Sequence, residues 1–475
     1  MPSLFTRNFG IFNATTFEYF VSTGLSKLYI TLGRPQEWSN TADYALAGND
    51  AVVTPVDTSN TYYGVWNDMI GMKRVTSADI NLVIPRVDWV ANTRYVEYTQ
   101  DAQIFARANS SNIAYDNKFY VRNTRDQIFK CLFNNANSGG VAALSTQMPQ
   151  IDVGGQLPEN PYIETSDGYR WKYMYTIPYG LKQKFFTSDY MPIVDEQIVT
   201  NSAENGRIDI VKIISDGAGF NANTNNNFLD ILTVNGDGTG ANIRVNVQSS
   251  AANGGNIVGY TVVSGGNNYT RASISLIDVN KSPDTANANL VAVIGPPGGH
   301  GSNVASELGA SFMMISTTIE GTEDDTIPAI SGGVNRFRQV CIMKDPMLTT
   351  DVLATESVYR TTTKYFLAAT SGAFQNREKI YSGASLATAN LTAVVEHYDS
   401  PNSVLYINNT INAANINLSN SFTVTGANSG ATSTVISYED TTVKLYSGEL
   451  LYVQNSSYIT RDPTEHQQVK IVLRF

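Results

Sequence analysis

The residue types able to do chemistry meet at one Gly-rich segment, "GPPGGHGSN" (295–303), in which His300 closely precedes Ser302. Such a pair could act as base and nucleophile, and clustered glycines could hold a phosphate through main-chain N–H groups. No Lys-Ser or Lys-Thr follows the glycines, and no G-x-S-x-G surrounds the serine, so neither a P-loop nor a nucleophile elbow is present. We interpret the segment as a loop that closes a preceding module, and we expect no catalytic residue.

Metal-ligating residue types are scattered through the chain. The segment "DVNKSPD" (278–284) has Pro283 where a calcium-binding EF-hand loop needs Gly, and "EGTEDDT" (320–326) is more typical of a solvated turn than of a cation site. None of the histidines has a second ligand at metal-binding spacing: His300, His397 and His466. We therefore expect no metal ion and no cofactor.

The two cysteines lie in apolar runs, Cys131 in "IFKCLF" and Cys341 in "QVCIMK". Two buried free thiols are expected, with a single disulfide as the alternative. The N-terminus has no basic region followed by an apolar stretch, and no run approaches the ~18 apolar residues of a membrane helix. We expect a soluble protein made in a cytoplasm, with no membrane partner.

The charge balance argues against nucleic-acid binding. The chain has 42 acidic and 32 basic residues, a formal net charge of −10, and no cluster of Lys or Arg. An acidic protein is repelled by phosphate backbones. We expect no nucleic-acid partner.

The stretch "SDGYRWKYMYTIP" (166–178) alternates aromatic and other residues almost without error. Its period of two predicts a β-strand, with Tyr169, Trp171, Tyr173 and Tyr175 on one face. That face could stack nucleic-acid bases or sugar rings, contact another subunit, or lie in the core. We favour the core, because base-stacking surfaces are usually accompanied by a basic groove.

The composition as a whole predicts a mainly β fold. Only 16% of the 475 residues are charged, 26 are Tyr, and long Glu/Lys/Leu/Ala helices are absent. Short helices are predicted at 13–24, where Thr15 would be the N-cap and Gly24 the stop, at 58–71, and near 302–310.

Gly/Asn-rich composition divides the chain into a discontinuous core and two inserted β-modules. In the first module, "IVKIISDGAGF" (210–220) and "GYTVVSGGNNY" (259–269) form a weak internal repeat. The second contains two similar hairpin halves, "SGASLATANLTAVV" and "GANSGATSTVIS". The predicted core segments are 1–205, 309–365 and 439–475, and the predicted modules are 206–308 and 366–438.

Several segments, in order, resemble the baseplate wedge proteins of T-even-type contractile-tailed bacteriophages, in particular the wedge subunit numbered eighth among the tail genes. They are "LYITLGRPQEWSN" (28–40), "DMIGMKRVTSADINLVIPRVDWVANTRY" (68–95), "DGYRWKYMYTIP" (167–178), "NRFRQVCIMKDPML" (335–348), "SGELLYVQN" (447–455) and "VKIVLRF" (469–475). The resemblance implies a non-enzymatic structural protein with a β-sandwich core. It also implies a homodimer, assembly with other wedge proteins, and a place in the virion tail baseplate.

Partner contacts are expected where anchoring residue types lie in turn-rich segments. We select Trp38, Arg86, Trp89 and Arg94 as candidates, because Trp and Arg are enriched at interface hot spots. The alternative is that both Trp residues cap sheet ends and both Arg residues pair with local Asp. Two other functions remain open: a tail-associated carbohydrate- or receptor-binding module that contacts the host surface through the inserts, and a tail-associated hydrolase that uses His300.

Overall fold

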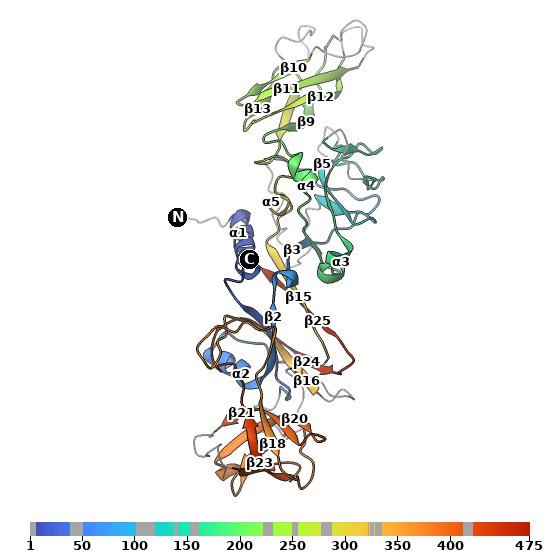
Figure 1. The fold of residues 1–475 in the computed structure, drawn as a ribbon. Helices are drawn as coiled ribbons and strands as arrows, with labels where there is room; N and C mark the ends of the chain where they lie inside the picture. Colours follow the sequence, from blue (N-terminus) through green and yellow to red (C-terminus); the bar gives the residue numbers. More distant parts are fainter. Residues whose placement is uncertain are drawn as a thin grey trace. The chain divides into compact units, whose positions relative to one another are not determined.

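The computed structural model describes residues 6–38, 51–100, 119–136, 141–152, 161–221, 231–248, 255–276, 287–321, 323, 327, 335–411 and 421–475. The chain forms two compact units, each assembled from segments far apart in the sequence (Figure 1). Unit 1 comprises Met1–Thr15, Asn81–Met314 and Leu473–Phe475, and unit 2 comprises Thr16–Ile80 and Ile315–Val472. The predicted mainly β fold is confirmed, whereas the four predicted boundaries between core segments and modules stay predictions.

Four elements run from one unit into the other: α1 (Arg7–Ser22), β3 (Ile80–Pro85), β15 (Phe312–Ile319) and β25 (Gln467–Arg474). The predicted start of the first helix is wrong, because Thr15 lies inside α1 and its hydroxyl donates to the carbonyl oxygen of Ile11 (3.0 Å). A hydroxyl that bonds back to the preceding turn cannot cap the helix. The predicted stop is confirmed, since Gly24 has a left-handed φ of 69° and its N–H donates to Val21 O.

In unit 1, one antiparallel sheet has the strand order β4-β5-β7-β6. Its strands are β4 (Tyr120–Arg122), β5 (Gln127–Phe133), β6 (Ile163–Glu164) and β7 (Arg170–Thr176). The aromatic stretch forms β7, and Tyr169, Trp171 and Tyr175 are completely buried, so the core interpretation is confirmed. Lys172 and Met174 on the opposite face are buried as well. The strand therefore lies inside the protein on both faces.

The Gly/Asn-rich part of unit 1 forms two further antiparallel sheets around its own apolar core. Their strands are β9 (Ile208–Ser215), β10 (Leu232–Gly236), β11 (Thr239–Val247), β12 (Ile257–Asn267), β13 (Ala272–Ile274) and β14 (Asn289–Ile294). The sheet orders are β12-β11-β10-β13 and β14-β9. The two repeated sequence segments form β9 and β12, and each pairs with a strand outside the repeated segments: β9 with β14, and β12 with β11.

The remaining elements of unit 1 are short. They are α3 (Tyr179–Phe185), β8 (Tyr190–Pro192), which pairs with β3, α4 (Gln197–Asn201) and α5 (Val304–Leu308). The predicted helix near 302–310 is thus confirmed as α5. Asn303 caps its start by accepting from Ser306 N (2.8 Å), and Gly309 ends it with a φ of 77°.

In unit 2, a five-stranded antiparallel sheet has the order β17-β2-β1-β16-β24. Its strands are β1 (Leu28–Gly33), β2 (Met69–Val75), β16 (Asn335–Lys344), β17 (Val358–Arg360) and β24 (Glu449–Arg461). The pairing of β1 with β16 confirms that the core is discontinuous in sequence. The short helix η1 (Ser77–Asp79) follows β2. The helix predicted at 58–71 is present as α2 (Ser59–Asp68), which begins after the cap Thr58 and packs Val65 and Trp66 into the core. The predicted end is wrong, because residues 69–71 belong to strand β2.

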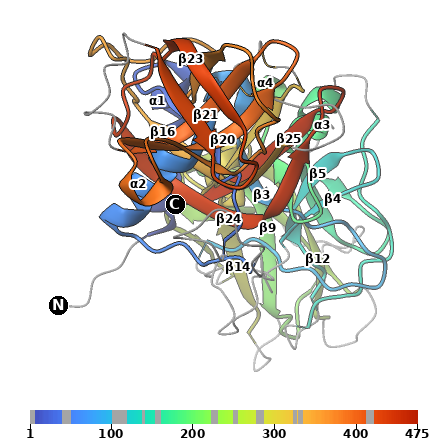
Figure 2. The ribbon, with the colours of Figure 1, turned by 90° about the horizontal axis from the view of Figure 1, so that it is seen from below.

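Unit 2 also contains a closed six-stranded barrel, whose strands are visible side by side in Figures 1 and 2. Its strands are β18 (Thr363–Leu367), β19 (Lys379–Ser382), β20 (Leu391–Asp399), β21 (Val404–Ile411), β22 (Phe422–Gly426) and β23 (Thr432–Glu439). The short helix η3 (Leu386–Thr388) lies in the β19–β20 connection. Both predicted hairpin halves are present, as β19–β20 and β22–β23. Barrel closure leaves these strands without free edges.

Candidate interaction site

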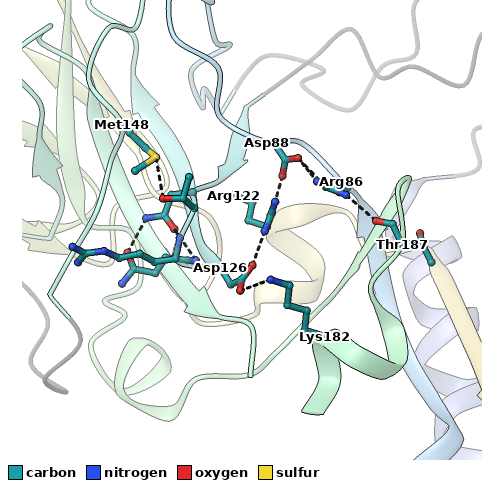
Figure 3. A network of polar contacts seen from close by, with 11 residues as sticks. Arg86, Asp88, Arg122, Asp126, Met148, Lys182 and Thr187 are labelled. Atoms are coloured by element: carbon teal, nitrogen blue, oxygen red, sulfur yellow. Dashed lines mark hydrogen bonds and ion pairs between the residues drawn. The ribbon is translucent and has the colours of Figure 1, made fainter. Parts of the chain in front are cut away.

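A chain of ion pairs in unit 1 includes Arg86, one of the predicted contact residues (Figure 3). Arg86 Nη2 lies 2.5 Å from Asp88 Oδ2, whose other carboxylate oxygen accepts from Arg122 Nε at 2.7 Å. The Arg122 guanidinium reaches Asp126 (2.5 Å), and Asp126 also accepts from Lys182 of α3 (2.8 Å). One polar network therefore holds together the segment after β3, strand β4, the turn between β4 and β5, and helix α3.

The turn between β4 and β5 places Asp126 in this network. Asp126 has a left-handed φ of 59°, and its N–H donates to Asn123 O. The Asn123 side chain holds the same turn, because its Oδ1 accepts from the N–H groups of Arg125 (2.8 Å) and Gln127 (3.0 Å). Asn and Asp favour such turns because their side chains bond the local backbone.

The ring of Phe186 lies beneath the cations of the network. Its centroid is 4.7 Å from the Arg86 guanidinium carbon, 4.9 Å from that of Arg122 and 5.7 Å from Lys182 Nζ. Burial opposes ionisation of Asp88, but hydrogen bonds from the two Arg residues outweigh it and lower its pKa. Three cations face two carboxylates, so the network carries one excess positive charge on an otherwise acidic protein.

Trp89 and Arg94 lie on the segment that follows this network. Trp89 is half-buried and its Nε1 donates to Ser145 Oγ (3.0 Å), while Arg94 is exposed and its Nε donates to Ala142 O (2.9 Å). The main chains of Trp89 and Arg122 are also hydrogen bonded, so the structure brings Arg86 and Trp89 onto one framework. Arg94 is the most accessible of the three.

Trp38, the fourth candidate, belongs to unit 2 and is 7% exposed. Its Nε1 donates to Ser456 O (2.7 Å), and the Arg34 guanidinium stacks on its ring at 5.2 Å. These contacts hold the Trp38 side chain within unit 2. Whether any of the four candidates contacts a partner stays a prediction.

His300 lies in a buried ionic cluster and not beside a nucleophile. Its Nδ1 is 3.2 Å from Lys130 Nζ and 3.3 Å from Glu307 Oε2, and its ring packs edge-on against Tyr98. Burial and the Lys130 charge lower the pKa of His300, so the ring is neutral at pH 7. Burial opposes ionisation of Glu307, but Lys130 outweighs it and lowers the pKa of Glu307 to about 2. The arrangement joins β5 to the loop before α5.

The predicted thiols are confirmed: Cys131 and Cys341 are buried and free. Burial raises the pKa of Cys341 to about 12. Among the described residues, no group of His, Cys, Asp and Glu is arranged to hold a metal ion. The segment 278–284 and most of 320–326 lie outside the described residues. No helix in the described part of the chain is long and apolar enough to cross a membrane.

Helix α1 carries exposed aromatic residues that the sequence analysis missed. The side chains are between 43% and 63% exposed: Phe9, Phe12, Tyr19 and Phe20. At about 100° per residue they fall within roughly one quadrant of the helix surface. The signal was present in the sequence, but a helix predicted to begin at residue 13 could not place Phe9 and Phe12 on the same face as Tyr19.

These observations define a mainly β protein built of several antiparallel sheets and a closed six-stranded barrel. No family model matches the chain. Over 187 residues, the chain is 25% identical to "Baseplate wedge protein gp8" of Enterobacteria phage T4, which agrees with the resemblance found in the sequence. The match covers 35% of this chain and 52% of that protein, so the chain spans about half of the length of the curated relative it matches.

Proposed function

We propose that this protein is a structural subunit of a bacteriophage tail baseplate wedge and acts by protein–protein assembly, without catalysis. The observation that carries the proposal is the match to the phage T4 wedge protein. The ion pairs around His300 support it, because the histidine is neutral, buried and bonded to Lys130 and Glu307. Under this proposal the protein works in the virion tail, after synthesis and assembly in the host cytoplasm.

The exposed aromatic face of α1 supports an assembly function. Phe12 and Tyr19 are 63% and 58% exposed, and large exposed apolar patches are a mark of interaction sites. Aromatic residues and Arg supply most hot spots at protein interfaces. We propose that the partners are other wedge proteins and a second copy of this chain.

Affinity capture tests the proposal. Tagged full-length protein would be added to lysate from phage-infected cells, and retained proteins would be identified and quantified by mass spectrometry after a moderate salt wash. Retention of several tail proteins in a fixed ratio supports the wedge function. Retention of host glycan or envelope material without tail proteins would contradict it. Light scattering of the purified chain, with 51.8 kDa expected for a monomer, tests the proposed dimer independently.

A further inference from the structure

A groove of about 570 Å³ lies within unit 2, beside the first residues of strand β24. It is lined by residues 448–453 on one wall and by residues 55–58, Thr61 and Tyr62, which lead into α2, on the other. Two hydrogen bonds connect the walls: the Tyr62 hydroxyl donates to Gly448 O (3.2 Å), and Asn455 Nδ2 donates to Val53 O (2.7 Å). The groove is therefore a formed feature of unit 2.

Strand β24 presents a long edge along this groove. It ends the strand order of its sheet, and no described strand pairs with its outer edge. It has 13 residues, whereas β17 at the opposite edge of the sheet has three. Proteins commonly protect an exposed edge with a short strand, Pro or Lys, and β24 contains neither Pro nor Lys. The main chain beside the groove can therefore pair with a further strand.

Exposed apolar side chains line and surround the groove. Leu451 is 41% exposed, and it has no partner residue in β16 because the ladder passes directly from Leu450 to Tyr452. Bulges of this kind redirect a side chain. Val56 on the opposite wall is 61% exposed. Neighbours of the lining along the chain are between 44% and 51% exposed: Val52, Val53, Tyr63, Leu445 and Tyr446. Such a patch is a mark of an interaction site.

The groove is acidic. Its described lining contains the acids Asp57 and Glu449 and no base. Glu449 Oε2 lies 3.0 Å from Lys344 Nζ of β16, whereas Asp57 is exposed on the other wall. A basic partner therefore fits this surface. A second copy of this chain fits it less well, because a symmetric pair brings the same surface of both copies together and acids would face acids.

We propose that this groove binds an extended segment of a different protein, which adds a strand to the edge of β24. The segment would place apolar side chains beside Leu451 and Val56 and a Lys or Arg beside Asp57. Only an extended chain repeats its N–H and C=O groups at the spacing of about 3.3 Å per residue that a strand edge requires. This surface is separate from the exposed face of α1. The inference goes beyond the proposed baseplate function and does not depend on it.

Fluorescence anisotropy with the full-length protein tests the proposal. The probes are labelled nonapeptides that alternate Val and Thr and carry one Lys, placed at each position in turn. We expect at least one peptide to bind with a Kd of about 1 mM or tighter. Successive N–H groups of a strand point to opposite sides, so N-methylation of one alternate set of amides should weaken binding about tenfold, and methylation of the other set much less.

Variants in the two walls locate the binding site. Leu451→Lys and Val56→Lys introduce a charge at exposed positions, so both should fold and weaken peptide binding about fivefold. Ile436→Lys is the matched control, because Ile436 is 60% exposed on barrel strand β23 and lies outside the lining. Asp57→Asn should weaken binding of the Lys peptide about threefold and leave the affinity of the same peptide with Thr in place of Lys unchanged. Urea unfolding curves would establish that each variant is folded.

Four outcomes would overturn the proposal. The first is absence of binding by the whole panel at about 10 mM peptide. The second is an equal effect of the two methylation patterns, which excludes strand addition. The third is wild-type affinity in both Leu451→Lys and Val56→Lys, which places the peptide elsewhere. The fourth comes from light scattering: a wild-type dimer that Leu451→Lys converts to a monomer would show that a second copy of the chain covers this edge.

Discussion

The Nζ atom of Lys130 lies 2.8 Å from Oε2 of Glu307, although 177 residues separate them in the chain. The two side chains are 1% and 5% exposed. The other carboxylate oxygen of Glu307 accepts from the N–H of Gly301 at 2.5 Å, and the Tyr98 ring centroid lies 4.2 Å from Lys130 Nζ. One carboxylate thus connects strand β5, the Gly-rich loop and helix α5.

Glu307→Gln is expected to destabilise the protein by about 3–5 kcal/mol, because it leaves the Lys130 charge buried without a counter-charge. Urea unfolding followed by circular dichroism measures this loss. The double variant Lys130→Met/Glu307→Leu should be much more stable than Glu307→Gln, since both charges are then absent. Glu204→Gln is the control, because Glu204 is 51% exposed in its pair with Arg207 and should cost less than about 1 kcal/mol. Equal losses in Glu307→Gln and Glu204→Gln would contradict the assignment.

Glu396 on barrel strand β20 is expected to make the stability of the folded protein depend on pH. Glu396 is 2% exposed, and burial raises its pKa from 4.5 to about 8 despite the opposing charge of Arg377. The folded protein therefore keeps this proton up to about pH 8, while the unfolded chain loses it near pH 4.5. The contribution of Glu396 to the free energy of unfolding is complete below pH 4.5. It is lost as the pH rises from 4.5 to 8, by up to about 1.4 kcal/mol per pH unit.

Glu396→Gln should remove most of this dependence, because the amide stays neutral at every pH. We expect the variant to be about 2–4 kcal/mol more stable than the wild type at pH 8 and close to it near pH 5. Urea unfolding at both pH values measures the difference, with the exposed Glu465→Gln as control. A wild-type pH slope retained in Glu396→Gln would show that another group is responsible.

Glu378 holds the β22–β23 turn of the barrel. Its carboxylate accepts from the N–H groups of Asn428 (3.0 Å) and Ser429 (2.9 Å), from Ser429 Oγ (2.7 Å), and from Gln375 N (2.6 Å). Glu378→Ala should cost about 3 kcal/mol, because hydrogen bonds to a buried carboxylate are strong and the amide donors are left unpaired. Hydrogen exchange should accelerate at Asn428 and Ser429. Glu449→Ala, which changes a carboxylate that is 64% exposed, is the control and should leave these amides protected.

Arg94 is the exposed member of the predicted contact set, so it offers the clearest test of that set. Under the proposed assembly function, Arg94→Glu should reduce the retention of tail proteins about tenfold, because it reverses the charge of a proposed contact residue. Arg271→Glu is the matched control, since the Arg271 side chain is 86% exposed in the same unit. Equal retention in the two variants would remove Arg94 from the contact set, and the unfolding curve of Arg94→Glu would establish that the variant is folded.

Local patterns in the sequence determined the mainly β class, the position of β7, the presence of the helices α2 and α5, and both barrel hairpins. These features depend on contacts between residues close in the chain. The alternating pattern places Tyr169 and Trp171 on the same face of a strand, whichever segment of the chain packs against that face. Likewise, Asn303 caps α5 through a donor three residues away.

Only the tertiary structure decided which distant segments meet. Four features depend on residues far apart in the chain. They are the burial of Lys172 on the second face of β7, the pairing of β9 with β14, the Lys130–Glu307 ion pair and the groove lined by Val56 and Leu451. A strand pattern states which face is apolar, but every apolar strand is a possible partner for every other. The choice among them depends on packing and on the pairing of buried charges, which no short window of sequence contains.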